Sequence, residues 1–76
     1  MTADCIQKND KILGHRIKTA REKKGLTQTN LATECGVSFQ QIQKYESGIN
    51  RVSVSRLIQI AGALRMQPEK FIEGLR

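Results

Sequence analysis

The sequence predicts a compact all-α domain built from five helices. Apolar residues recur at spacings of three and four, which is the period of an amphipathic helix. One proline and six scattered glycines separate short segments, and no alternating Val/Ile/Thr run indicates a sheet. A chain of 76 residues has room for one small domain. We find no repeat, linker or low-complexity segment that would indicate a second one.

The first helix is expected from Lys11 to Lys24. Residues 1–9 are polar and are expected to form a flexible N-terminal tail ahead of a domain at 10–76. Asp10 is the predicted N-cap, and Gly25 has the residue type that ends a helix. The predicted core face consists of Leu13, Ile17 and Ala20.

Two short helices follow, each with its own cap. Thr27 is the predicted N-cap of a helix at 28–35, whose inward residues are Leu31 and Ala32. Gly36 makes the next turn. Ser38 then caps a helix that runs to Ser47 and ends at Gly48.

The last two helices carry the most regular apolar patterns. Ser53 opens the fourth, with a predicted core stripe of Val54, Leu57, Ile58, Ala61 and Leu64. Pro68 at a first helical position starts the fifth, which carries Phe71, Ile72 and Leu75.

The pair at 28–35 and 38–47 has the pattern of a helix-turn-helix. Ala32 is small enough for a second helix to cross close to it, and Gly36 supplies the backbone freedom of the turn. Val37 and Ile42 are suited to fill the angle between the helices. A glycine-linked helix pair alone occurs in many bundles. The helix-turn-helix prediction rests instead on several side chains that have the right size at this spacing.

The charge balance favours a polyanionic partner. Thirteen Lys and Arg face seven Asp and Glu, giving a net charge of +6 and a pI near 9.8. Such a balance is typical of nucleic-acid-binding proteins, although a solvated basic surface without a partner is the alternative. No apolar run approaches the roughly 20 residues of a membrane span, and the N-terminal residues lack the pattern of a signal peptide.

Metal sites, cofactors and catalysis are not expected. Cys5 and Cys35 do not make a disulfide framework and are interpreted as free thiols in a reducing cytoplasm. His15 is the single histidine, and no metal-ligand spacing accompanies it. A nucleophile–base set is also missing, so we do not expect an enzyme.

Taken together, these positions resemble the Cro/C1-type (XRE-like) helix-turn-helix family over residues 12–72. The resemblance rests on Gly25-Leu26-Thr27-Gln28, Leu31-Ala32, Gly36-Val37-Ser38, Ile42, Tyr45-Glu46, Gly48, Leu57, Ile60-Ala61 and Ala63-Leu64. It implies a lambda-repressor-like bundle that binds double-stranded DNA as a homodimer on a two-fold symmetric operator. No small-molecule ligand is expected, because no residues remain for a ligand pocket, and the lack of an apolar run predicts no membrane partner. We expect a cytoplasmic location with association to the nucleoid through DNA.

The helix at 38–47 is the predicted reading element. At 100° per residue, Ile42 and Tyr45 point inward and a polar face points outward. Glutamine can pair with adenine and lysine with guanine, although both residues are also good exposed helix formers. The expected base-readout set, in part implied by the resemblance, is Ser38, Phe39, Gln40, Gln41, Gln43 and Lys44. Phe39 could pack on the preceding helix or touch a thymine methyl.

Phosphate contacts are expected from other segments. Gln28 opens a helix, where backbone N–H groups bind anions. The loop after the reading helix offers Ser47, Gly48, Asn50 and Arg51, although Asn and Ser are also common loop formers. Between Lys8 and Lys24, seven basic residues face Asp10 and Glu22, a local net charge of +5 that would steer the protein towards DNA.

The resemblance also implies a structural pair and an interface. Arg21 and Glu46 are expected to form a partly buried ion pair, the alternative being a solvent-exposed carboxylate. A homodimer seam is expected on the fifth helix region at 67–76 and the end of the fourth, comprising Leu64, Met66, Phe71, Ile72 and Leu75. These apolar residues could instead close the monomer core.

The function expected from the sequence is a sequence-specific transcriptional regulator. Its size and layout resemble small autoregulators, such as the controller proteins of restriction–modification systems or a prophage Cro-like repressor. The alternative is an antitoxin that neutralises a partner toxin and binds its own promoter. The sequence contains no information on the operator, on the target genes or on activation versus repression.

Overall fold

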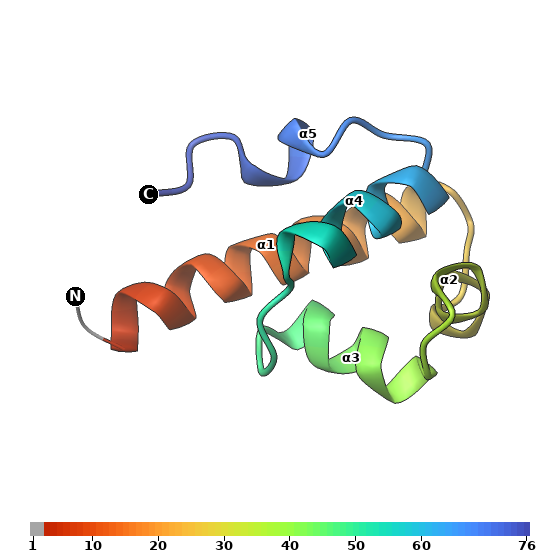
Figure 1. The fold of residues 1–76 in the computed structure, drawn as a ribbon, viewed down its shortest axis with the longest axis horizontal. Coiled ribbons are helices and arrows are strands. Elements are labelled where there is room, and N and C mark those ends of the chain that lie inside the picture. The colour runs from red at the N-terminus through yellow and green to blue at the C-terminus, as the bar shows by residue number, and fades with distance from the viewer. Residues whose placement is uncertain (1–2) are drawn as a thin grey trace.

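The computed structural model describes residues 3–76, and within that range it contains five helices and no strand. The helices are α1 (Ala3–Lys23), α2 (Gln28–Cys35), α3 (Phe39–Ser47), α4 (Val54–Ala63) and α5 (Glu69–Ile72). Figure 1 shows α1 along the length of the molecule, with α3 on one side of it and α5 on the other. The predicted all-α, five-helix bundle is confirmed.

Helix α1 begins earlier than predicted. Residues 3–9, expected to form a tail, are helical, while residues 1–2 of that predicted tail lie outside the described range. The Asp10 N-cap prediction is therefore wrong, because Asp10 lies inside the helix. No proline or glycine interrupts the segment 3–13, and the Asp10 carboxylate has a cationic neighbour, with Arg51 Nε 3.6 Å from its Oδ2.

The helix-turn-helix forms as the local sequence predicts. Thr27 makes a capping box with Asn30: its hydroxyl accepts from the Asn30 N–H, and its own N–H donates to the Asn30 side chain. The Ser38 hydroxyl accepts from the Gln41 N–H at 3.2 Å and so caps α3. Between them, Gly36 has a left-handed conformation, and the Val37 N–H donates to the Ala32 carbonyl at 3.0 Å.

Helix α4 is rotated relative to the predicted stripe. Leu57, Ala61 and Leu64 are buried as expected, and Ile60 joins them. Val54 and Ile58 are instead 75% and 55% exposed. Both arcs of this helix are apolar, so periodicity alone did not decide which of them faces the core.

One core joins all five helices. Its buried members are Leu13, Ile17, Ala20, Leu31, Ala32, Cys35, Ile42, Tyr45, Leu57, Ile60, Ala61, Leu64 and Phe71. Cys35 is a free thiol whose pKa is raised by burial, and it packs as a small apolar side chain. None of the helices within 3–76 is both long enough and apolar enough to cross a membrane.

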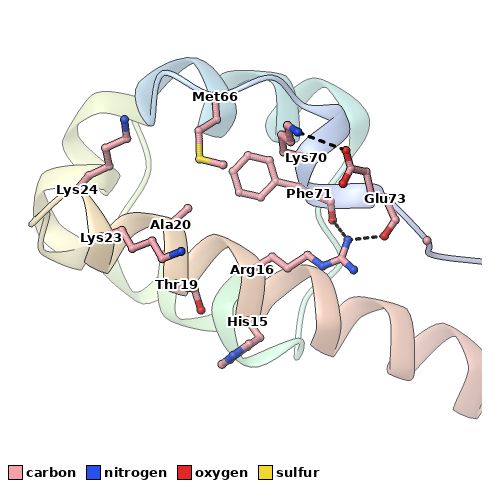
Figure 2. Close-up of a pocket in the computed structure, with 11 residues that line it drawn as sticks. His15, Arg16, Thr19, Ala20, Lys23, Lys24, Met66, Lys70, Phe71 and Glu73 are labelled. Carbon is pink, nitrogen blue, oxygen red and sulfur yellow. Dashed lines mark hydrogen bonds and ion pairs between the residues drawn. The ribbon is translucent and has the colours of Figure 1, made fainter.

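Helix α5 is held against α1 by one arginine. The Arg16 Nη1 donates to the carbonyls of Phe71 at 3.0 Å and Glu73 at 2.7 Å, which supplies partners to the end of a four-residue helix. Figure 2 shows these bonds beside a pocket of about 810 Å³ between α1 and α5. This pocket lies across α1 from α3.

Candidate nucleic-acid interface

Helix α3 has one buried face and one polar, exposed face. Ile42, Tyr45 and Glu46 are buried. Gln40, Gln43, Lys44 and Ser47 are exposed and Gln41 is half-buried, which agrees with the orientation predicted from helix geometry. The outer face therefore presents amides and one ammonium group, with no carboxylate among them.

Below this face, an ion pair joins α3 to α1. Arg21 Nε donates to Glu46 Oε2 at 2.7 Å, and Arg21 Nη2 donates to Glu46 Oε1 at 3.2 Å. Arg21 and Glu46 are 7% and 8% exposed. The hydrogen bonds with Glu46 raise the pKa of Arg21, because they favour its charged form. The pair is bidentate, which fixes its geometry as well as its charge.

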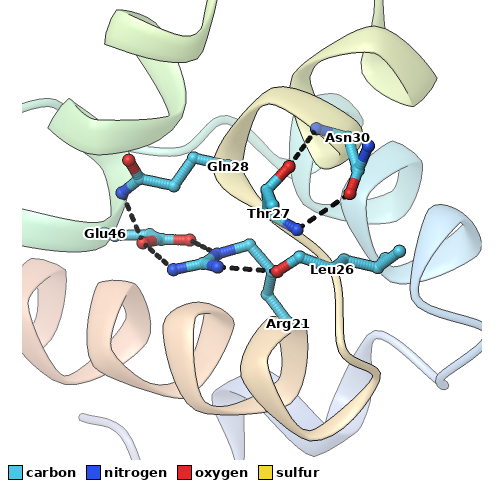
Figure 3. Close-up of polar contacts among 6 residues, drawn as sticks. All are labelled: Arg21, Leu26, Thr27, Gln28, Asn30 and Glu46. Atoms are coloured by element: carbon cyan, nitrogen blue, oxygen red, sulfur yellow. Dashed lines mark hydrogen bonds and ion pairs between the residues drawn. The ribbon is translucent and has the colours of Figure 1, made fainter.

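The same network reaches the start of α2. Arg21 Nη1 donates to the Leu26 carbonyl at 2.8 Å, and the Gln28 amide nitrogen donates to Glu46 Oε1 at 3.0 Å (Figure 3). Three helices thus meet at one carboxylate. Gln28 was expected to contact a phosphate, but in the structure its side-chain amide donates to Glu46. Only the second N–H of the Gln28 amide is left for a phosphate.

Glycines allow α1 and the end of α3 to pack at backbone distance. A Cβ on Gly14 would overlap the Tyr45 carbonyl oxygen, and one on Gly48 would lie 2.9 Å from the Lys11 nitrogen. The Gly48 N–H donates to the Tyr45 carbonyl at 3.2 Å and closes the helix. It is therefore not the free phosphate donor that the sequence predicted. The sequence did not indicate the packing role of Gly14, because a lone glycine inside a helix does not show which segment packs against it.

The end of α3 and the loop after it keep three of the expected polar groups near the surface. The Ser47 hydroxyl donates to the Lys44 carbonyl at 3.2 Å, and the Asn50 N–H donates to the same carbonyl at 3.2 Å. The Arg51 side chain is exposed and pairs with Asp10 across the loop. An exposed pair of this kind is weak enough to exchange for a phosphate.

Lys18 is a cation that the sequence analysis did not single out. It lines a groove of about 390 Å³ beside the outer face of α3. The other residues of this α1–α3 groove are Gln28, Gln43, Lys44, Glu46, Ser47 and Ile49. The signal lay in the basic run from Lys8 to Lys24, but the run did not show which lysine faces the reading helix.

Comparison with known families identifies this arrangement. Residues 17–71 match the helix-turn-helix family HTH_3. The chain belongs to this family. Among curated relatives, it is 49% identical over 72 residues to the uncharacterized HTH-type transcriptional regulator RP497 of Rickettsia prowazekii, covering 95% of this chain and 55% of the relative. It is 48% identical over 64 residues to y4wC of Sinorhizobium fredii, described in the same terms, covering 84% of this chain and 45% of the relative. The chain thus spans about half the length of these relatives.

Solved structures share the fold. The restriction–modification controller protein C.AhdI of Aeromonas hydrophila superposes with a TM-score of 0.82 at 28% identity, covering 86% of this chain and 94% of the other. The P22 c2 repressor in complex with a synthetic operator gives a TM-score of 0.76 at 27% identity, covering 83% and 96%. The lambda-repressor-like architecture of this helix-turn-helix chain is thereby confirmed.

The remaining expected site residues divide between core and surface. Leu64 and Phe71 are core residues, so their assignment to a homodimer seam is wrong, and the alternative that they close the monomer core holds for both. Met66 and Leu75 are half-buried against that core, while Ile72 is 48% exposed. Phe39, for which packing on the preceding helix and contact with a thymine methyl were both left open, is 43% exposed.

Proposed function

We propose that this helix-turn-helix chain regulates transcription by binding a two-fold symmetric DNA operator as a homodimer, with α3 in the major groove. The observation that carries the proposal is the outer face of α3, where Gln40, Gln43 and Lys44 are exposed together above a buried ion pair. The curated relatives are named HTH-type transcriptional regulators, and the P22 c2 repressor is described with an operator.

The base-reading chemistry follows from the donors and acceptors on that face. A glutamine amide matches the N6 and N7 edge of adenine, and a lysine ammonium can donate to O6 and N7 of guanine. We assign this readout to Gln40, Gln43 and Lys44, with Ser38 and Gln41 at the helix start. The Ser38 hydroxyl oxygen accepts the Gln41 N–H, and its O–H remains available to donate to DNA.

Phosphate contacts would flank the reading helix on both sides. Ser47 ends α3, Asn50 and Arg51 follow it, and Lys18 lies across the α1–α3 groove. Such contacts set register and orientation on the duplex but carry no sequence information. Their charge, within a net of +6, supplies the salt-dependent part of the affinity.

A homodimer requires an apolar surface outside the monomer core. We assign it to Val54 and Ile58, which lie one turn apart on α4, with Ile72 on α5 as a second exposed apolar group. An exposed apolar pair on a small domain is a natural contact surface. Two copies related by a two-fold axis would place their α3 helices about 34 Å apart, in successive major grooves.

Selection of bound fragments from random DNA tests the proposal. The expected product is an enriched pair of inverted half-sites whose centres lie one helical turn apart. An enriched sequence without symmetry would remove the homodimer, and no enrichment at all would contradict sequence-specific binding. Repeating the selection with a Gln40→Ala variant shows which base positions depend on α3.

A further inference from the structure

Phe39 is an aromatic side chain at an unusual position for its type. Of the three aromatic residues in the chain, Tyr45 and Phe71 are buried in the core. Phe39 is 43% exposed and is the first residue of α3. Most large apolar side chains of such a small domain are needed for its core. An exposed phenyl ring on the reading helix is therefore available for an external contact.

The surroundings of Phe39 are polar, so it adds a different kind of recognition. Gln40, Gln43 and Lys44 bind hydrogen-bonding edges of bases, but an amide or ammonium group gains little from a methyl group. Ile49 is also exposed, yet it lies beyond the C-terminal end of α3. In helix-turn-helix proteins the N-terminal residues of the recognition helix contact the base edges.

The major groove presents one apolar group at the base edges, the methyl on C5 of a pyrimidine. Thymine always carries it, and cytosine carries it when methylated at C5. We infer that Phe39 reads a pyrimidine C5-methyl group in the major groove. It thereby distinguishes thymine from uracil, and 5-methylcytosine from cytosine, at one position of each half-site. This inference rests on the proposed placement of α3 in the groove.

The expected size of the effect follows from burying one methyl group. Removing a methyl from water corresponds to about a fourfold change in affinity, and a symmetric operator contains two such contacts. Loss of both methyls should therefore weaken binding by about 15-fold. The Phe39→Ala variant should bind more weakly and become insensitive to the methyl group.

The test uses synthetic versions of the selected operator in two matched pairs, each of which differs only at C5. Each thymine is compared with uracil opposite adenine, and at the same position 5-methylcytosine is compared with cytosine opposite guanine. Dissociation constants are measured by fluorescence anisotropy for the wild type, for Phe39→Ala and for Ile49→Ala. Ile49→Ala is the matched control, because it removes an exposed apolar side chain at the other end of α3. Melting curves check that both variants are folded.

Support requires one symmetric position at which uracil weakens the wild type and Ile49→Ala but leaves Phe39→Ala unchanged. Preference for thymine over uracil there assigns the methyl to thymine. Preference for 5-methylcytosine over both thymine and cytosine assigns it to the modified base. If uracil weakens the wild type and Phe39→Ala equally, or neither, the inference is wrong, while specific binding and the proposed function stand. If the selection yields no operator, both fail together.

Discussion

Glu46 accepts three side-chain hydrogen bonds, two from Arg21 and one from Gln28, on a helix proposed to face DNA. A buried carboxylate is costly unless cations and donors satisfy its oxygens. Arg21 fits this task better than lysine would, because its planar fork binds both carboxylate oxygens and still donates to the Leu26 carbonyl. The contribution of each residue therefore depends on the other.

The first prediction concerns this pair. Arg21→Ala and Glu46→Ala should each lower the free energy of unfolding by about 3 kcal/mol, because either change leaves a buried charge without its partner. The double variant should lose clearly less than the sum of the two. Urea melts of all four proteins measure the coupling. Additive losses below about 1 kcal/mol would show that the pair is not coupled.

The second prediction separates reading from charge. Gln40→Ala should erode discrimination between the operator and random DNA by roughly 1–3 kcal/mol per half-site while leaving the salt dependence unchanged. Arg51→Ala should weaken specific and random DNA alike and reduce the slope of log affinity against log salt.

Lys24→Ala is the matched control for the loss of one positive charge. Lys24 lines the pocket between α1 and α5, across α1 from the reading helix, so its removal should change the slope less than Arg51→Ala does. If titrations at several salt concentrations show the same change in slope for both substitutions, Arg51 contributes only through its positive charge.

At the scale of helices, the parts predictable from sequence were those set by local chemistry. Thr27, Ser38 and Ser53 each cap the helix that follows, because a hydroxyl two or three residues before a free N–H needs no distant partner. The start of α1 was mispredicted because Asp10 looked like such a cap, whereas its carboxylate faces Arg51, far along the chain. Contacts between segments that are distant in sequence cannot be predicted from the local residue pattern.

The packing of α1 against α3 is also a contact between segments that are distant in sequence. The sequence implied Arg21 and Glu46 as partners through the family resemblance, but Gly14 carried no comparable mark. Its role follows from the path of another helix's backbone, because the Tyr45 and Glu46 carbonyls occupy the space of its Cβ. Only the assembled fold shows this approach.

The third prediction compares two glycines that are both inside helices. Gly14→Ala should lower the free energy of unfolding by about 3 kcal/mol, because its Cβ meets backbone atoms that cannot rotate away. Gly62→Ala in α4 is the control: nothing lies within 4 Å of its Cβ, so alanine should stabilise by about 0.5–1 kcal/mol. Thermal or urea melts give both values. Similar changes for the two variants would contradict the proposed close approach.

At the scale of the whole molecule, the sequence predicted the bundle and the outward face of α3 but not the apolar surface left outside the core. Leu64 and Phe71 looked available for a seam because a short fifth helix seemed to need little core contact. In a domain of 76 residues, the core has few other large side chains to draw on. The apolar residues left exposed include Val54 and Ile58, which lie on α4 beside the arc that faces the core.

The fourth prediction tests this surface as a homodimer contact. Sedimentation over a range of protein concentrations should show a reversible monomer–dimer equilibrium for the wild type, with dissociation in about the micromolar range for so small an interface. Ile58→Asp should shift it to monomer and weaken operator binding. Ile72→Asp, on α5, reports separately on the predicted contribution of that helix. A wild type that stays monomeric on a symmetric operator would contradict the homodimer.

The Arg21–Glu46 pair also has a consequence at long range. From the position of a phosphate, a cation and an anion 2.7 Å apart act as a small dipole, whose potential decays much faster with distance than that of a single charge. The one carboxylate of α3 therefore adds little to the electrostatic potential that an approaching polyanion meets. The far field on this side of the molecule then comes from the unpaired cations of the surface. In the proposed complex, α3 keeps its buried carboxylate without repelling the duplex.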